Sequence, residues 1–278
     1  MRRRSWCRLT VLAVIWALAP GCGERPAPPP PRAPPPEVQC KHFIYGLPGG
    51  TPPTNDLIIR DAYALSSNDD TKLADWVAYR LDQDTVTGEA ETDRRWRADP
   101  WLSEQETLEP DDYRDAHRVL GTDRGHQAPL GSFKGTAHWA QTNYLSNITP
   151  QQSDLNRGPW LRLEEKVRGL AASGEVVFVI TGPLFEREMR SLPRADEPHK
   201  VPSGHWKIVV VETAEELAAA AFIFDQETRR SARVIDHLVT IDEVERRSGL
   251  DFLWELPDGV EEQVEGGACS EWARERFG

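Results

Sequence analysis

A polar motif in the middle of the chain, Asp-Arg-Gly-His at residues 123–126, most constrains how this sequence can fold. The segment 153–170 follows it and has leucines at helical spacings, with Pro159 as the one residue that disfavours a helix. This segment carries Asn156 and Glu164, which lie about two helical turns apart and therefore face the same side. A fold that uses both segments must place the histidine beside one face of this helix.

The residue types in this pattern suit the hydrolysis of a phosphodiester. That reaction needs a base to activate water, a cation at the phosphate oxygens and fixed positive charge for the transition state. His126, Asn156 and Arg124 would fill these three roles. We expect the Asp-Arg-Gly-His motif to form a turn. Taken alone, the motif is also compatible with a polar surface turn. Its interpretation as part of a catalytic site therefore depends on the downstream residues.

The rest of the chain is typical of an α+β fold. Residues 82–115 are polar and rich in turn formers, which predicts a long surface excursion. Thr240 and Glu243 form a capping-box pattern for a helix that continues through Arg247 and ends at Gly249. We therefore expect a central, mainly antiparallel sheet flanked by helices. Strands are predicted at 57–65 (with its following turn), 75–81, 142–146, 176–180, 207–211 and 218–224.

Several longer motifs occur in order around these residues. They are Asp-Arg-Gly-His-Gln-Ala-Pro at 123–129, Asn-Tyr-Leu-Ser-Asn-Ile-Thr-Pro-Gln at 143–151, Leu155-Asn156, Trp160 and Leu163-Glu164, with Ala-Asp-Trp-Val-Ala-Tyr at 74–79 and Arg94 before Trp96 upstream. In these motifs the chain resembles the DNA/RNA non-specific endonuclease family of the ββα-metal superfamily, which includes the Serratia-type secreted nucleases and endonuclease G. The resemblance runs from about Ile59 to Leu170 and implies a ββα-metal nuclease fold.

The resemblance also implies roles for the residues that match. His126 is implied to be the general base that takes a proton from water. Asn156 is implied to be the single direct protein ligand of Mg²⁺, with Mn²⁺ as an alternative metal, because magnesium often keeps several of its waters. Glu164 is implied to hold one of those waters. Arg168 lies one turn beyond Glu164, where it would pair with that carboxylate or contact phosphate.

Three more matching residues have implied roles near the phosphate. Arg94 and Arg124 are implied to contact the phosphate and the transition state, where the forked geometry of a guanidinium helps. Asn147 is expected to orient His126 or its neighbourhood. Asp123 has no assigned catalytic role.

A site of this composition would recognise phosphate rather than bases, so DNA and RNA are both expected substrates. Trp76, Trp96 and Trp139 are expected in the core rather than as platforms for base stacking. A second hypothesis is a surface-tethered nucleic-acid-binding protein on an inactive nuclease fold. A third is a secreted toxin-like nuclease with a dedicated inhibitor, although the chain shows no delivery module. The sequence carries no signal for an oligomeric state.

The charge of the chain is acidic, with a formal net charge of −12 and a pI near 5.1. This argues against the basic footprint that is usual in nucleic-acid-binding proteins. Two interpretations are open: a solvated acidic face with scattered arginines, or a small basic cleft on an acidic body. Acidic residues gather around 212–216, 242–245 and 261–265. Arginines gather instead at Arg94, Arg95, Arg97, Arg124, Arg157, Arg162 and Arg168.

The first residues are typical of an export signal. Three arginines at positions 2–4 precede a short apolar run, so we predict a signal peptide at 1–21 and no transmembrane span in the mature protein. Cys22 follows either as a lipid-anchored cysteine of a bacterial lipoprotein or as an incidental thiol after ordinary cleavage. A proline-rich linker at 22–38 leads to a nuclease domain at 39–278. The protein is expected to be secreted, periplasmic or lipid-anchored at the bacterial envelope.

Two cysteines belong to the predicted domain. Cys40 and Cys269 stand near its two ends, and in an oxidising compartment they would form one disulfide that ties the ends together. The alternative is two unpaired thiols. The sequence has no CxxC motif or Cys/His cluster of the kind that binds zinc.

Overall fold

The computed structural model describes residues 39–89, 94–212, 217–267 and 271–278 of the chain. Cys40 is half-buried at the beginning of this part. Three expected features lie outside the described residues: the export signal at 1–21, the linker at 22–38 with Cys22, and Cys269 of the expected disulfide.

The central sheet has seven strands among the described residues, and every neighbouring pair is antiparallel. Their order in space is β1-β2-β3-β6-β7-β8-β9. The strands predicted at 75–81, 176–180, 207–211 and 218–224 are confirmed, and the one predicted at 57–65 spans β1 and the turn into β2. The strands are β1 (Asp56–Ile59), β2 (Ala64–Asn68), β3 (Leu73–Leu81), β6 (Val177–Leu184), β7 (Gly204–Glu212), β8 (Leu217–Asp225) and β9 (Leu238–Val239).

Helices and helical turns connect and cover the strands. Among the described residues, no helix is both long enough and apolar enough to cross a lipid bilayer. The described part of the excursion at 82–115 contains α1, and α2 begins directly after it. This part of the chain contributes no strand to the central sheet. The helices are α1 (Gln83–Val86), α2 (Ala116–Leu120), α3 (Ser153–Leu155), α4 (Leu161–Ala172), α5 (Ile241–Ser248), α6 (Asp258–Gly266) and α7 (Glu271–Phe277), and the tighter or wider turns are η1 (Leu130–Ser132), η2 (Trp139–Asn143), η3 (Leu145–Asn147), η4 (Asn156–Trp160) and η5 (Val234–His237).

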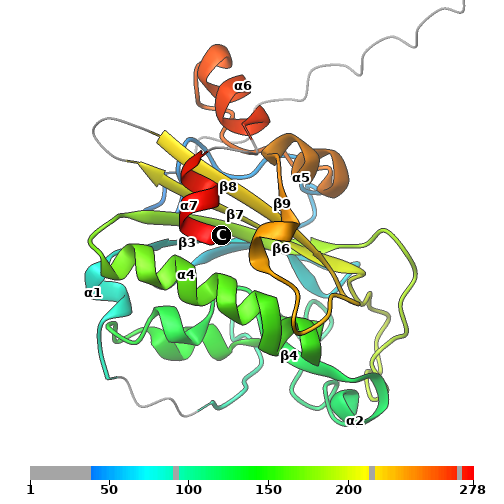
Figure 1. The fold of residues 1–278 in the computed structure, drawn as a ribbon. Helices are drawn as coiled ribbons and strands as arrows, with labels where there is room; N and C mark the ends of the chain where they lie inside the picture. Colours follow the sequence, from blue (N-terminus) through cyan, green and yellow to red (C-terminus); the bar gives the residue numbers. More distant parts are fainter. Residues whose placement is uncertain (1–38, 90–93, 213–216, 268–270) are drawn as a thin grey trace, which may run out of the picture. The chain divides into compact units, whose positions relative to one another are not determined.

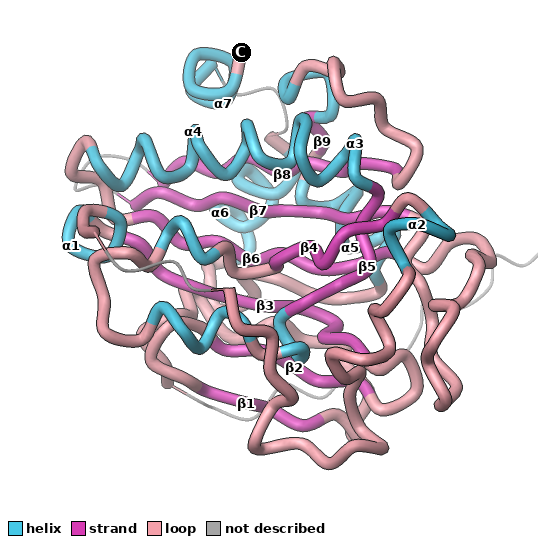
Figure 2. Tube along the Cα trace, turned by 90° about the horizontal axis from the view of Figure 1, so that it is seen from below, coloured by secondary structure: helices cyan, strands magenta, loops and turns pink. Residues whose placement is uncertain are grey.

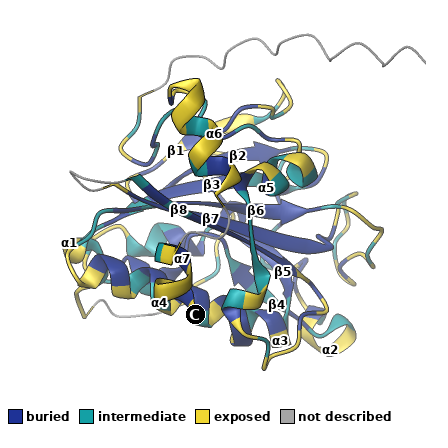
Figure 3. Ribbon diagram, turned by 45° about the horizontal axis from the view of Figure 1, so that its top comes forward, coloured by how far each residue is buried: buried dark blue, intermediate teal, exposed yellow. Residues whose placement is uncertain are grey.

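The central strands are apolar on both faces because helices cover both faces. On β7, Val209 and Val211 pack in the cluster that includes residues of α4 and α7, whereas Ile208 and Val210 pack in the cluster that includes residues of α5. This alternation follows from the two-residue repeat of a strand. Figure 1 shows α4 on one side of the sheet and α5 with α6 on the other. Figure 3 shows that the strands between them are almost entirely buried.

The site-bearing part of the fold is a separate ribbon of two antiparallel strands, β4 (Thr122–His126) and β5 (Ile148–Gln152), followed by helices. Arg124 and His126 stand at alternate positions of β4, so they share one face of the ribbon. Position 125 between them requires a glycine, because a Cβ there would be only 2.6 Å from Gln151 Oε1. β5 leads straight into α3, η4 and α4, which run almost in line (Figure 2).

Two local predictions for this ribbon are wrong. The motif at 123–126 forms strand β4 instead of a turn, and the strand predicted at 142–146 is replaced by turns η2 and η3, with the strand beginning at Ile148. The Asn147 amide explains the second difference, because it bonds to the backbone of Ala128 and to Thr142 O and so closes a compact loop. Pro150 is tolerated in β5 because a two-stranded ribbon leaves each strand one free edge.

The helix predicted at 153–170 is present but broken. Gly158 has φ −113° and ψ −117°, which is outside the helical region, and Pro159 follows it without a backbone N–H. The chain therefore widens into η4 before α4 begins. The predicted helix at 241–247 is confirmed as α5, with Thr240 Oγ1 accepting from Glu243 N at 3.0 Å. The Glu243 carboxylate bonds to Arg246.

A buried histidine ties the chain before β1 to strand β3. His42 is 2 % exposed, its Nε2 donates to Arg60 O at 2.9 Å, and its Nδ1 accepts from Arg80 N at 3.4 Å. One nitrogen must donate and the other accept, so only the neutral ring satisfies both bonds. Burial lowers the pKa of His42 from the usual 6.5 to about 4.

This low pKa predicts a loss of stability in mild acid. Between pH 6.5 and 4 the unfolded chain takes up a proton at His42 that the folded chain does not, so this residue alone lowers the free energy of unfolding by about 3 kcal/mol as the pH drops through this range. Urea unfolding at pH 7 and pH 4 measures the difference. His42→Gln should reduce the pH dependence, whereas the exposed control His138→Gln should leave it unchanged. Equal pH dependence in all three proteins would contradict the prediction.

Candidate active site

A cleft of about 510 Å³ opens over the ββα part of the fold. Five of the residues predicted from the sequence line it: Arg94, Arg124, His126, Asn156 and Glu164. The two others, Asn147 and Arg168, are outside its lining. The residues that complete the lining are Trp96, Tyr113, Ala116, His117, Thr122, Asp123, Arg157 and Leu161.

His126 ends strand β4 at the edge of the cleft. Its Nε2 lies 3.3 Å from Asn143 Oδ1, and its ring packs 5.2 Å from the Trp96 ring between centroids. The pKa of His126 is lowered to about 4, chiefly by burial; the bond to Asn143 opposes this shift and the charge of Arg94 adds to it. The imidazole is therefore neutral near pH 7. Because Asn143 Oδ1 accepts, Nε2 carries the proton, and Nδ1 is left as the basic nitrogen.

The direct partner of His126 is therefore Asn143, a residue that the sequence analysis missed. The sequence signal for Asn143 was its position in the motif at 143–151, but only Asn147 of this motif was expected to have a role in the site. Asn147 is fully buried and braces the loop that follows His126, through bonds of 2.8 Å from Ala128 N and 2.9 Å to Ala128 O. Asn147 thus holds the neighbourhood of His126 and does not hold its ring.

Arg124 presents a partly buried guanidinium to the cleft. Its Nη2 donates to Pro110 O at 2.9 Å, and its Cζ lies 5.6 Å from the Trp96 ring and 5.4 Å from the Tyr113 ring. Its Nε is buried and has no hydrogen-bond partner among the described residues. A buried N–H of a cation without an acceptor is costly, and the oxygen of an anion would satisfy it.

Asp123 orients the amide of Asn156. Asn156 Nδ2 donates to Asp123 Oδ2 at 3.0 Å, and Arg157 binds both oxygens of the same carboxylate at 2.7 and 2.6 Å. Burial would raise the pKa of Asp123, but the bonds from Arg157 and Asn156 outweigh it, so the pKa lies below its usual value. A carboxylate only accepts, so Nδ2 must face Asp123 and Oδ1 must face elsewhere. No role for Asp123 was expected from the sequence.

Glu164 is 9 % exposed at the base of the cleft and shares its buried surroundings with a lysine of the sheet. Lys207 is fully buried on β7, with Nζ 4.5 Å from the Trp160 ring and 3.4 Å from Tyr79 Oη. Burial raises the pKa of Glu164, and the charges of Lys207 and Arg168 oppose this shift. Burial likewise lowers the pKa of Lys207, and Glu164 opposes it.

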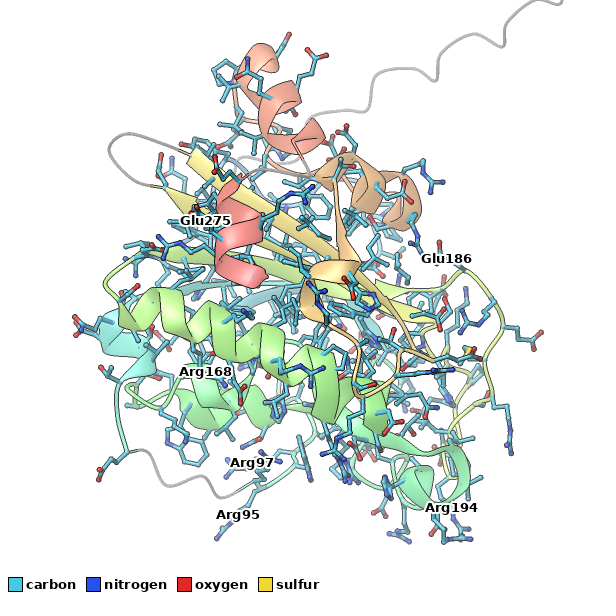
Figure 4. The ribbon with its side chains drawn as sticks, viewed as in Figure 1. Arg95, Arg97, Arg168, Glu186, Arg194 and Glu275 are labelled. Carbon is cyan, nitrogen blue, oxygen red and sulfur yellow. The ribbon has the colours of Figure 1, made fainter. Side chains whose placement is uncertain are left out.

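Lys207 was also missed by the sequence analysis, which treated 207–211 only as an apolar strand. The available signal was a charged residue next to an otherwise apolar run that both faces of the sheet bury. Arg168 stands on α4, one turn after Glu164 (Figure 4). Its positive charge lowers the pKa of Glu164 and so opposes the effect of burial. That Arg168 pairs with Glu164 or contacts phosphate stays a prediction.

The rim of the cleft is basic although the chain is acidic. Arg94 and Arg157 line it together with Arg124, and Figure 4 places Arg95 and Arg97 on the same side of the molecule as Arg168. The segment of Arg97 is fixed beside the loop of His126, because Arg97 N donates to Asn143 O at 3.2 Å. The structure thus favours the small basic cleft over scattered arginines.

The three tryptophans expected in the core differ in their surroundings. Trp76 is fully buried, and Trp139 is half-buried against the main apolar cluster. Trp96 is half-buried and packs against a smaller apolar cluster, as expected, but it also lines the cleft beside His126 and Arg124. The aromatic ring is needed there because it shields both polar groups from water.

The cleft offers oxygen donors that fit a divalent cation. Asn156 Oδ1 points away from Asp123, and the Glu164 carboxyl lines the same cleft. An amide oxygen and a carboxylate are the ligand types that Mg²⁺ takes, together with water. A bound cation would also offset the burial that raises the pKa of Glu164.

Comparison with known proteins agrees with this geometry. The model of the DNA/RNA non-specific endonuclease family matches residues 41–259. The nuclease of Serratia marcescens is 45% identical over 212 residues, which cover 75% of this chain and 79% of that protein. Human mitochondrial endonuclease G is 31% identical over 233 residues, which cover 75% of this chain and 72% of that protein.

Among solved structures, the crystal structure of the EndoG/EndoGI complex contains a similar chain. It is 26% identical, aligns with a TM-score of 0.67, and the match covers 77% of this chain and 90% of that one. The expected ββα-metal nuclease fold, with its mainly antiparallel sheet and flanking helices, is confirmed. The chain belongs to the DNA/RNA non-specific endonuclease family.

Proposed function

We propose that this protein is an exported, Mg²⁺-dependent endonuclease that hydrolyses phosphodiester bonds in both DNA and RNA. Membership of the family gives the class of activity, hydrolysis of nucleic-acid phosphodiesters. The observation that carries the finer proposal is the meeting of a neutral histidine, an unpaired guanidinium N–H and an oriented amide oxygen in one cleft.

His126 is the general base of this proposal. Its Nδ1 takes a proton from a water molecule as the water oxygen forms a bond to phosphorus. The bond from phosphorus to the 3′ oxygen breaks on the opposite side, and that oxygen receives a proton from solvent. The products carry a 5′-phosphate and a 3′-hydroxyl. Asn143 keeps Nδ1 in its basic form because it holds the ring proton on Nε2.

Arg124 and Arg94 hold the phosphate in this proposal. The buried Nε of Arg124 donates to a non-bridging oxygen, and the bond is strong because donor and acceptor are both charged. These contacts reach the backbone of the nucleic acid and leave the base edges unread. The same cleft therefore accepts DNA and RNA.

Asn156 would bind the divalent cation, Mg²⁺ or in its place Mn²⁺, directly, and Glu164 would hold one of the cation's water molecules. When bound, the cation supplies positive charge that stabilises the developing charge on the phosphate and leaving oxygens. Asp123 presents the Asn156 oxygen by binding the other end of its amide. Lys207 and Arg168 favour the ionised form of Glu164.

The export part of the proposal depends on the sequence of the first residues. A charged start, a short apolar run and Cys22 support a signal peptide with either lipid attachment or ordinary cleavage. The proline-rich segment at 22–38 would then separate the domain from a membrane surface. Mass measurement of the mature protein from bacterial envelopes distinguishes a lipidated Cys22 from a plain cleaved end.

The activity is tested with residues 39–278 on supercoiled plasmid and on a folded RNA, with Mg²⁺ and with chelator. We expect both substrates to be degraded only in the presence of the metal. Binding without cleavage of either substrate by the folded domain would contradict the proposal and favour the inactive nucleic-acid-binding protein. Cleavage of one nucleic acid alone would contradict the broad specificity.

His126→Ala should lower the cleavage rate by about 10²–10⁴-fold, because it removes the base. Nucleic-acid binding should persist, because the arginines stay in place. The matched control is His138→Ala, which removes an exposed histidine outside the cleft lining and should change the rate little. A near-normal rate for His126→Ala, with the circular dichroism of the folded protein, would assign the base elsewhere.

Asn156→Ala should raise the Mg²⁺ concentration that gives half the maximal rate, by about 10-fold or more, because it removes the ligand oxygen. The readout is the rate of plasmid cleavage over a Mg²⁺ titration. Asp154→Asn is the matched control, since it removes an exposed carboxylate on α3, the short helix just before Asn156. Superimposable titrations for Asn156→Ala and the wild type would place the cation on other residues.

A further inference from the structure

A second group of oxygen ligands lies far from the cleft, between α5 and α6. Asp242 and Glu245 stand on α5, and Glu265 stands on α6. One carboxylate oxygen from each lies within 4.8 Å of the others. Figure 1 shows these two helices on the face of the sheet opposite to α4, which carries Glu164.

Glu265 is the unusual member of this group. Its side chain is 7 % exposed, and its Oε1 is buried without a hydrogen-bond partner among the described residues. A buried carboxylate oxygen that has no donor is costly and needs an explanation. The carboxylate of Glu265 converges with those of Asp242 and Glu245, so a ligand between the three side chains would lie beside this unpartnered group.

The surroundings of Glu265 are acidic. Burial first, and then the charges of the four neighbouring acids, raise the pKa of Glu265 to about 8; these acids are Glu245, Glu261, Asp242 and Asp251. The carboxyl of Glu245 is held in place by Phe252 N, which donates to its Oε1 at 2.8 Å. Five acids so close together repel one another unless protons or a cation neutralise them.

The basic residues of α5 do not neutralise this group, because they pair with other acids. Arg246 binds Glu243 at 2.6 Å, and Arg247 binds Glu186 at 2.5 Å. These pairs turn the two guanidinium groups toward carboxylates outside the cluster. A mobile cation from solution is therefore the partner that the cluster lacks.

We propose that Asp242, Glu245 and Glu265 bind Ca²⁺ and thereby join α6 to α5. Ca²⁺ takes six to eight oxygen ligands at about 2.3–2.6 Å in flexible geometry, so two oxygens on one ion lie at most about 5 Å apart. The spacing within 4.8 Å fits this limit. Asp251 and Glu261 add negative charge around the site and favour a divalent over a monovalent ion. The site is structural and independent of the proposed nuclease mechanism.

The test is thermal unfolding of the chelator-treated mature protein over a CaCl₂ titration. At about a hundredfold excess over Kd, Tm should rise by about 5–10 °C. Glu265→Gln should abolish this rise, and Glu262→Gln, an exposed control on the same helix, should keep it. Asn156→Ala should also keep it, which separates this site from the cation of the cleft.

Calorimetric titration with CaCl₂ gives a second readout that does not depend on the fold of Glu265→Gln. Asp242→Asn changes an exposed side chain, so this variant should fold, and it should lose most of the binding heat. An unchanged wild-type Tm up to about 10 mM Ca²⁺, beyond the range of weak protein sites, would overturn the proposal. So would equal Tm shifts in the wild type and Glu265→Gln.

Discussion

The burial of Glu164 and Lys207 in one region joins the catalytic helix to the sheet. Glu164 belongs to α4 and Lys207 to β7, and both lose almost all contact with water. Buried charges are costly unless an opposite charge is near, and each of these two groups favours the ionised form of the other. The apolar contacts of Leu163 and Val167 hold α4 on the sheet and so keep the two groups in one buried region.

The cleft follows from this fixed helix. Once α4 is placed, Asn156 and Glu164 have defined positions, and the ribbon of β4 and β5 brings His126 and Arg124 to the same side. Each of these side chains is then held by a group that has no contact with the substrate in our proposal. Asn143 holds the histidine ring, and Asp123 holds the amide. His126 and Asn156 are thus each paired with a residue that fixes the orientation of the side chain.

The sequence predicted the parts of the fold that depend on local pattern. Strands β3, β6, β7 and β8 could be predicted because apolar runs indicate buried strands, and α5 because Thr240 and Gly249 mark its ends. The ribbon could not be predicted, because its strands are polar and Pro150 interrupts the pattern of β5. The turns before it depend on contacts of the Asn147 side chain with residues far away in the sequence.

The site was predicted to a similar extent. The residues that would touch phosphate, water or cation stand in motifs, and the structure brings five of them into one cleft. The supporting residues were missed because their roles come from pairing in space. Lys207 meets α4 only after the sheet has formed, and the link between Asp123 and Asn156 joins a strand to a helix. The contacts of Trp96 with His126 and Arg124 could not be predicted, because the sequence does not show which polar groups an aromatic ring will cover.

The break at Gly158 and Pro159 has an electrostatic consequence. It makes Leu161 the first residue of α4, and Leu161 lines the cleft. The peptide dipoles of a helix sum to roughly half a positive charge at its amino end. An unbroken helix would have its only amino end at Ser153. The interruption therefore gives the helical segment a second amino end beside the cleft, and its partial positive charge adds to the field of the arginines without another charged side chain.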